Sequence, residues 1–234
     1  LPTARHDLLA GQYAFGSVQT TRGCPLHCDF CSVTSFNGAR FRQRPIHRVI
    51  EELAAVPEDL VLIVDDNLIG TKRAHIDRSK DLFRAMIKAK LKKRWVAQTT
   101  MNVANDDELL SLAAQAGCRG MFVGFESPRP EESKEAQSKH ALCKCHDLAQ
   151  GVRNIQRHGI LVAGSFIIGL EGDGPGIGRL IADTAERIGV DFLNVLFLTP
   201  LPGTRLGDEM DDQNRISLQN FPADWSYFTL TYPV

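Results

Sequence analysis

Residues 147–168 read DLAQGVRNIQRHGILVAGSFII, and this stretch shows the unit from which the chain is built. Asp147–His158 has the apolar spacing of a helix, Gly159 ends that helix, and Ile160–Ile168 is an apolar run of strand length. A glycine after a helix supplies the left-handed backbone at which a helix stops, so the chain can turn straight back into a strand. The stretch therefore predicts a helix–glycine–strand joint.

The same joint recurs at Gly117 and at Gly189. Before Gly117, Asn105 and Glu108 have the spacing of a capping box, which predicts that a helix begins there. The apolar runs between the helices are short and continuous, which is typical of strands buried on both faces of a parallel sheet. We expect six such strands: Ser17–Thr20, Leu60–Asp65, Arg94–Thr100, Cys118–Phe125, Ile160–Ile168 and Val190–Leu198.

Six strand–helix units predict an α/β fold. A closed barrel of eight units takes about 250 residues, whereas this chain has 234. We therefore expect an open, partial (β/α)6 barrel, TIM-like in its geometry, over residues 17–203. Residues 1–16 are interpreted as a linker or N-terminal extension. Residues 204–234 are interpreted as an irregular C-terminal extension with one short helix near Leu206–Met210.

The composition is that of an ordinary globular protein, with 43% hydrophobic and 24% charged residues. Lys and Arg number 27 against 28 Asp and Glu, so the charge gives no reason to expect a nucleic-acid partner. No run approaches the roughly 20 apolar residues of a membrane span. The first residues do not resemble a secretory signal, so we expect a cytoplasmic protein whose thiols stay reduced.

Three of the six cysteines lie close together, in the sequence TTRGCPLHCDFC at residues 20–31. The spacing C-x3-C-x2-C places Cys24, Cys28 and Cys31 within eight residues, so their thiolates can surround one metal centre. A zinc site normally takes four ligands, and only His27, awkwardly placed between two of the cysteines, is nearby. A [4Fe–4S] cluster held by three thiolates leaves one iron open. We favour the cluster; zinc, or a disulfide or chance spacing, is the alternative.

The other cysteines have simpler interpretations. Cys118 lies in an apolar strand and is expected to be a small buried residue. Cys143 and Cys145, with His146, have a spacing that could suit a second metal site, but no partner pair is found elsewhere. We interpret these two as exposed or helix-edge cysteines.

The cysteine loop, with Phe30 before its last cysteine, resembles the radical S-adenosylmethionine (SAM) superfamily, and the resemblance covers roughly residues 15–230. The wider sequence is similar to radical SAM proteins that carry an N-terminal cobalamin-binding domain. The further matching stretches are Arg42-Gln43-Arg44-Pro45, Val64-Asp65-Asp66-Asn67, Gly124-Phe125-Glu126-Ser127, Gly164-Ser165-Phe166 and Thr199-Pro200-Leu201-Pro202-Gly203-Thr204. The chain begins about where the linker to that domain would lie. We therefore expect the cobalamin domain to be missing and the face on which it docks to be unusually apolar.

The resemblance implies an enzyme. Cys24, Cys28 and Cys31 would hold the cluster, and SAM would chelate the open iron. One electron from a flavodoxin- or ferredoxin-type reductant would then cleave SAM into methionine and a 5′-deoxyadenosyl radical, which takes a hydrogen atom from an unactivated carbon of a small-molecule or lipid substrate. The chain would act in this way alone or as the catalytic domain of a cobalamin-dependent methyltransferase. The alternative is a non-catalytic iron–sulfur or zinc protein in electron transfer or regulation.

The resemblance also indicates which residues would contact SAM, because barrel folds place their sites at the carboxyl ends of the strands. Asp66 would receive the amino group, unless it or Asn67 caps the next helix. Gln98 lies near the end of the third strand. Glu126 and Ser127 end the fourth, where relatives bind ribose hydroxyls or the methionine carboxylate. A carboxylate buried there needs a partner, and a structural ion pair is the alternative for Glu126.

Phe30 is expected near the adenine of SAM, or as an anchor of its loop. The fifth strand departs from the superfamily pattern Gly-x-Ile-x-Gly-x-x-Glu that often supports adenine. Residues 165–172 read SFIIGLEG, which keeps the apolar and glycine positions but misplaces the acid. The role of Glu171 therefore stays open.

Overall fold

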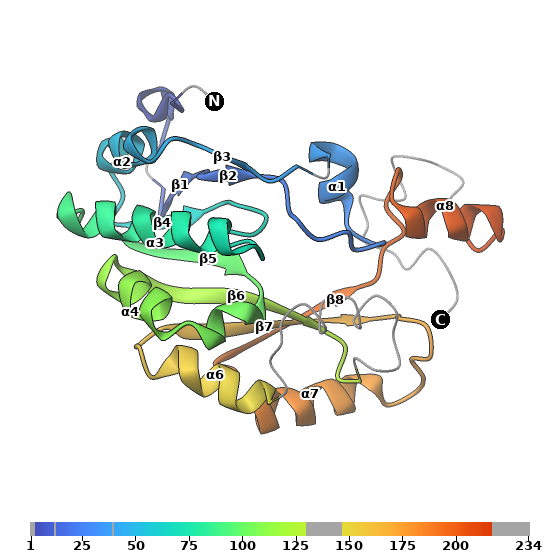
Figure 1. The fold of residues 1–234 in the computed structure, drawn as a ribbon. Coiled ribbons are helices and arrows are strands. Elements are labelled where there is room, and N and C mark those ends of the chain that lie inside the picture. Colours follow the sequence, from blue (N-terminus) through green and yellow to red (C-terminus); the bar gives the residue numbers. More distant parts are fainter. Residues whose placement is uncertain (1–2, 12, 39, 130–146, 217–234) are drawn as a thin grey trace.

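The computed structural model describes residues 3–11, 13–38, 40–129 and 147–216 of the 234-residue chain. Its centre is a sheet of six parallel strands in the order β1-β4-β5-β6-β7-β8. The strands are β1 (Gly16–Val18), β4 (Leu60–Ile63), β5 (Arg94–Thr99), β6 (Cys118–Glu126), β7 (Leu161–Ile168) and β8 (Phe192–Phe197). The predicted α/β fold, an open six-unit barrel, is confirmed (Figure 1). Strand β1 begins one residue before the predicted boundary at residue 17.

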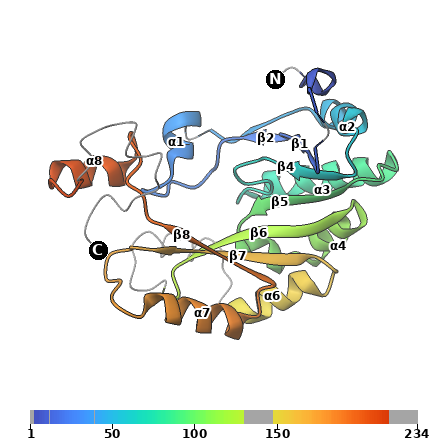
Figure 2. The same ribbon diagram turned by 180° about the vertical axis from the view of Figure 1, so that it is seen from behind.

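The longer helices pack along one side of this sheet, as Figure 1 shows. They are α2 (Ile46–Ala55), α3 (Arg73–Lys88), α4 (Asp107–Gln115), α6 (Leu148–Gln156) and α7 (Ile177–Ile188). The core between helices and sheet includes Trp95, which stacks on Phe83 with ring centroids 5.3 Å apart. Along β5, Trp95, Ala97 and Thr99 are buried, while Val96 and Gln98 point to the other, more open side. In Figure 2 the molecule is turned by 180°, and this open side of the sheet faces the viewer.

The three helix–glycine–strand joints are present as predicted. Gly117, Gly159 and Gly189 have φ angles of 100°, 75° and 78°. At Gly117 a side chain is also excluded by space, because a Cβ atom would run into the carbonyl oxygen of Lys93. These joints lead the chain from a helix directly into β6, β7 and β8.

The predicted capping box is wrong by one residue. Asn105 ends the 3-10 helix η2 (Met101–Asn105), and Asp106 is the residue that caps α4, accepting a 3.0 Å hydrogen bond from the Leu109 amide. Glu108 binds the buried ammonium of Lys80 at 2.7 Å instead of reaching back to the cap. The cause is tertiary: Lys80 draws both Asp106 and Glu108 toward α3.

Several short elements beyond the six units were not predicted. They are the 3-10 helix η1 (His6–Leu8), strands β2 (Thr21–Arg22) and β3 (Arg42–Gln43), which pair antiparallel, and helix α1 (Ser32–Asn37). The short helix expected near Leu206–Met210 is α8 (Arg205–Asp212). Elements of two to six residues are too short to show a period in the sequence.

No helix in the described part of the chain is long and apolar enough to cross a membrane. Cys118 is buried as predicted, and burial raises the pKa of its thiol to about 12. It therefore stays protonated at neutral pH. Cys143 and Cys145 lie outside the described residues.

Candidate active site at the carboxyl ends of the strands

The first half of the cysteine loop is fixed by two acids that follow β4. Buried Asp65 accepts hydrogen bonds from the Thr20 amide at 2.6 Å and from the Thr20 hydroxyl at 2.5 Å. Burial raises the pKa of Asp65, although the bonds from Thr20 oppose that rise. Asp66 accepts a 3.0 Å hydrogen bond from the amide of Gly23, the residue before Cys24. The start of the loop is thus tied to the end of the neighbouring strand.

A network of buried charged side chains also supports the start of the cysteine loop. The β2–β3 pairing brings Arg44 beside Thr20, whose carbonyl accepts a 3.0 Å hydrogen bond from the Arg44 amide. The guanidinium of Arg44 donates to Glu52 at 2.5 Å, and Arg78 donates to the Arg44 carbonyl at 2.7 Å. Because both ions of the Arg44–Glu52 pair are buried, breaking the pair would leave a charge without compensation.

The second half of the loop is compact. The Cys31 amide donates to the Cys28 carbonyl at 3.1 Å, and α1 begins at the next residue, Ser32. Phe30 is half-buried beside a small apolar cluster that includes Leu206 and Met210 of α8. The predicted role of Phe30 as an anchor of its loop agrees with this packing.

The three loop thiols are half-buried, and none of them forms a disulfide. The disulfide alternative is therefore wrong for these cysteines. In the described residues, no three His, Cys, Asp or Glu side chains are gathered for a single metal ion. The three thiols share one loop with both ends held, and their spacing along the chain is that of a donor set for a multi-iron cluster rather than for a single ion.

Asp66, Gln98 and Glu126 follow or end three neighbouring strands, β4, β5 and β6, at the carboxyl edge of the sheet. The capping alternative for Asp66 and Asn67 is wrong, because α3 begins after Lys72 without a side-chain cap. Asn67 instead accepts a 3.0 Å hydrogen bond from the Gly70 amide. A carboxylate has about four acceptor positions, and the bonds of Asp66 to Gly23 and Asn37 (3.4 Å) use one oxygen, Oδ2.

Glu126 has an unusual backbone. It is 5% exposed and has a φ of 67°, a left-handed conformation that costs a non-glycine residue roughly 1–2 kcal/mol. The Ser127 amide donates to the Phe125 carbonyl at 2.9 Å, so the chain makes a tight turn at Glu126. The pairing of β6 with β7 is irregular at the same place, between Gly124 and Glu126. Such strain is typical of functional sites.

The other residues singled out from the sequence, Gln98, Ser127 and Glu171, lie in different surroundings. Gln98 is exposed on the open side of β5. Ser127 is buried, and its hydroxyl accepts a 3.0 Å hydrogen bond from the Arg129 amide. At the end of β7, Glu171 is exposed, and Asp173 is the acid that turns inward and accepts from the amides of Gly169 and Leu170 at 2.9 and 3.0 Å.

The residues that sequence reasoning missed are those that support the loop. Thr20 and Arg44 lie in stretches that were singled out, but their partners are 45 and 8 residues away, and nothing local indicates the pairing. Arg78 lies on the amphipathic helix α3, where an arginine is usually a solvated residue.

A family model described as the radical SAM superfamily matches residues 18–177, which include the cysteine loop and the four strands from β4 to β7. The chain belongs to the radical SAM superfamily. This family uses a [4Fe–4S] cluster and SAM, and its members are enzymes. The donor set of the cysteine loop fits that cluster.

Curated relatives of this radical SAM chain are methyltransferases by name. It is 30% identical to the hopanoid C-2 methylase of Rhodopseudomonas palustris over 88% of this chain and 39% of the relative. It is 31% identical to the bacteriochlorophyllide d C-12(1)-methyltransferase of Chlorobaculum tepidum over 85% of this chain and 43% of the relative. The chain thus spans about two fifths of the length of these relatives.

A solved structure agrees with the fold. The radical SAM methyltransferase TsrM from Kitasatospora setae, with cobalamin and a [4Fe–4S] cluster bound, is 25% identical to this radical SAM chain with a TM-score of 0.73. The match covers 89% of this chain and 41% of that protein. The cobalamin-dependent SAM radical enzyme OxsB, at 16% identity and a TM-score of 0.58, shares the fold.

Proposed function

We propose that this chain is the catalytic barrel of a cobalamin-dependent radical SAM methyltransferase that acts on a small-molecule or lipid substrate. The observation that carries the proposal is the half-buried cysteine loop held at the carboxyl edge of a radical SAM barrel whose relatives are named methyltransferases. The non-catalytic alternative finds no support among these relatives.

In this proposal Cys24, Cys28 and Cys31 hold the cluster. When bound, the cluster and SAM supply a carbon-centred radical through one-electron cleavage of SAM. Asp66 and Asp65 fix the start of the loop through Gly23 and Thr20, which keeps the first thiolate in one place.

The remaining strand-end residues would bind SAM. Asp66 keeps acceptor capacity for the amino group, and Glu126 presents a buried carboxylate for the ribose hydroxyls. Ser127 and Gln98 would add hydrogen bonds from β6 and β5. Phe30 would offer an apolar side to adenine, next to its packing against α8.

Methyl transfer would require a cobalamin module in addition to this barrel. The apolar side chains of β8 that are exposed in this chain support a further covering module: Phe192, Leu193, Val195, Leu196 and Phe197. The protein would work in the cytoplasm with a flavodoxin- or ferredoxin-type electron donor, because the loop thiols must stay reduced.

Anaerobic reconstitution tests the proposal. The chain is loaded with iron and sulfide, reduced, and supplied with SAM, and 5′-deoxyadenosine is measured by chromatography. We expect SAM cleavage that depends on the three loop cysteines, and methyl transfer only when a cobalamin module is supplied. A reconstituted cluster that never cleaves SAM would favour the non-catalytic alternative. Methylation by the chain alone would contradict the need for cobalamin.

A further inference from the structure

The sheet of this barrel is open between its two edge strands. In the described part of the chain, β1 pairs only with β4, and β8 pairs only with β7. The segments that follow these two edge strands nevertheless meet beyond the carboxyl ends of the sheet. The cysteine loop follows β1, and the bridging segment, which we define as residues 199–212, follows β8 and contains α8.

Two hydrogen bonds and an ion pair join the cysteine loop, and α1 directly after it, to the bridging segment. The Leu206 amide donates to the Asp29 carbonyl at 3.0 Å, and the Ser35 hydroxyl donates to the Gly203 carbonyl. The Arg205 guanidinium lies 3.2 Å from the Asp29 carboxylate. This ion pair is 69% and 30% exposed, so it contributes little.

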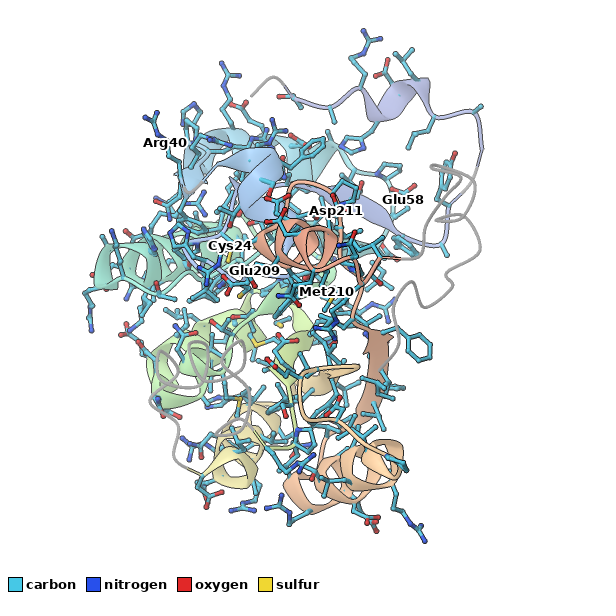
Figure 3. The ribbon with its side chains drawn as sticks, turned by 90° about the vertical axis from the view of Figure 1, so that its right-hand side faces the viewer. Cys24, Arg40, Glu58, Glu209, Met210 and Asp211 are labelled. Carbon is cyan, nitrogen blue, oxygen red and sulfur yellow. The ribbon has the colours of Figure 1, made fainter. Side chains whose placement is uncertain are left out.

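Apolar packing adds to these hydrogen bonds. Phe30 packs beside Leu206 and Met210 of α8 and beside Leu198 at the end of β8. Figure 3 looks onto α8, with Met210 labelled on the helix and Cys24 on the loop. Asp29 and Phe30 are the two residues between Cys28 and Cys31, so the contact fixes the stretch that carries two of the three proposed ligands.

The bridging segment is itself firmly shaped. The buried Thr204 hydroxyl accepts from the Gly207 amide at 3.0 Å and donates to the Leu201 carbonyl at 2.6 Å. A Cβ atom at Gly207 would run into that same carbonyl oxygen. Pro200 and Pro202 further restrict the backbone. The turn therefore aims the Leu206 amide at the cysteine loop, and glycine is required at position 207.

From this geometry we infer that the bridging segment positions the cluster ligands, with Gly207 and Ser35 as positioning residues. The inference rests on the proposed cluster at Cys24, Cys28 and Cys31. If the contact holds the loop in the ligating conformation, cluster binding and the docking of α8 are thermodynamically coupled. Such coupling is reciprocal: the cluster stabilises α8, and a docked α8 tightens cluster binding by the same factor.

Hydrogen exchange measures one side of this coupling. Amide exchange of residues 205–212 is followed by mass spectrometry in the iron-free and the cluster-loaded chain. We expect exchange in α8 to slow by about tenfold when the cluster is bound, which lies within the usual range of coupling between sites. Equal exchange rates in both forms would overturn the inference and leave the proposed cluster intact.

Matched glycine variants measure the other side. Gly207→Ala should push the turn away from the Leu201 carbonyl, release iron about tenfold faster, and change the EPR spectrum of the reduced cluster. Gly178→Ala, in α7, is the control, because a Cβ there meets nothing within 4 Å. Wild-type iron release and EPR in Gly207→Ala, with α8 exchanging faster, would overturn the inference.

Ser35→Ala is a second variant that tests the same contact if Gly207→Ala fails to fold. Ser35 is exposed, so its removal leaves the core intact, and only the bond to Gly203 is lost. We expect the same changes in iron release and in the EPR spectrum at roughly two- to threefold size, as fits a single exposed hydrogen bond. An unchanged spectrum and release rate would overturn the inference. A chain that binds no cluster through the three cysteines would overturn the proposed function and this inference together.

Discussion

The carboxylate of Asp66, after the second strand of the sheet, accepts a hydrogen bond of 3.0 Å from the backbone amide of Gly23, directly before the first proposed cluster ligand. Gly23 has a φ of 86°, and a Cβ atom there would run into the Arg40 carbonyl. The loop can therefore adopt this conformation only with glycine at position 23, and in this conformation Asp66 binds the Gly23 amide.

Two substitutions of Asp66 separate its support of the cysteine loop from its proposed binding of the SAM amino group. Asp66→Ala removes the acceptor for Gly23, and a hydrogen bond to a charged group is worth roughly 1.5–3 kcal/mol, so we expect iron loss about tenfold faster. Asp66→Asn keeps an oxygen for Gly23 but not the charge that would receive the SAM amino group. It should retain iron and bind SAM more weakly, as measured by iron release and equilibrium SAM binding. Equal SAM affinity in Asp66→Asn and wild type would remove Asp66 from the SAM site.

The triple variant Cys24→Ala, Cys28→Ala, Cys31→Ala should lose the visible absorption of the reconstituted cluster completely. Cys118→Ala is the matched control, because Cys118 is buried in the core with a pKa of about 12 and cannot readily become a thiolate. It should keep the full iron content. Loss of the absorption in Cys118→Ala alone would contradict the assignment of the ligands.

Glu126 offers a comparison of alanine with glycine at one position. Both Glu126→Ala and Glu126→Gly remove the carboxylate, and each should weaken SAM binding by about tenfold or more. Only glycine relieves the left-handed backbone at φ 67°, so Glu126→Gly should be more stable than Glu126→Ala by about 1 kcal/mol. Chemical denaturation and SAM titration measure the two effects. Unchanged SAM affinity in both variants would assign Glu126 to structure alone.

The Lys80–Asp106 pair predicts a pH dependence of stability. The Lys80 ammonium, 6% exposed, lies 2.9 Å from Asp106. Burial alone would raise the pKa of Asp106, but the bonds from Lys80 and the Leu109 amide lower it below 3.8 overall. A lowered carboxyl pKa stabilises the fold above the unfolded value, and that stability is lost as the pH falls through the folded value.

Lys80→Met should therefore reduce the free energy of unfolding at pH 7 by about 1–3 kcal/mol. The difference from wild type should begin to shrink below pH 4.5, because Lys80 also lowers the pKa of Glu108, and should shrink further below pH 3.8 through Asp106. Denaturation midpoints between pH 7 and pH 3 measure it. Asp77→Asn, which breaks the exposed pair with Arg73, is the control and should change stability little at any pH. A Lys80→Met deficit that stays constant down to pH 3 would show that Asp106 does not carry the effect.

The sequence by itself determined the fold class and indicated the chemistry of the cysteine loop. Helix period, glycine at Gly117, Gly159 and Gly189, and apolar runs of strand length are properties of single segments, so they can be read without the partners. The spacing of the three cysteines is equally local. These signals predicted the six parallel strands, which the structure confirms, and the cluster ligands Cys24, Cys28 and Cys31, which stay a prediction.

Only the tertiary structure decided how the loop is supported. Asp66 meets Gly23 across 43 residues, and α8 meets Asp29 from the far end of the chain. The shift of the cap from Asn105 to Asp106 has the same origin, since Lys80 on another helix binds Asp106 and Glu108. A parallel sheet brings the carboxyl ends of distant strands to one edge, and no local period in the sequence records which side chains meet there.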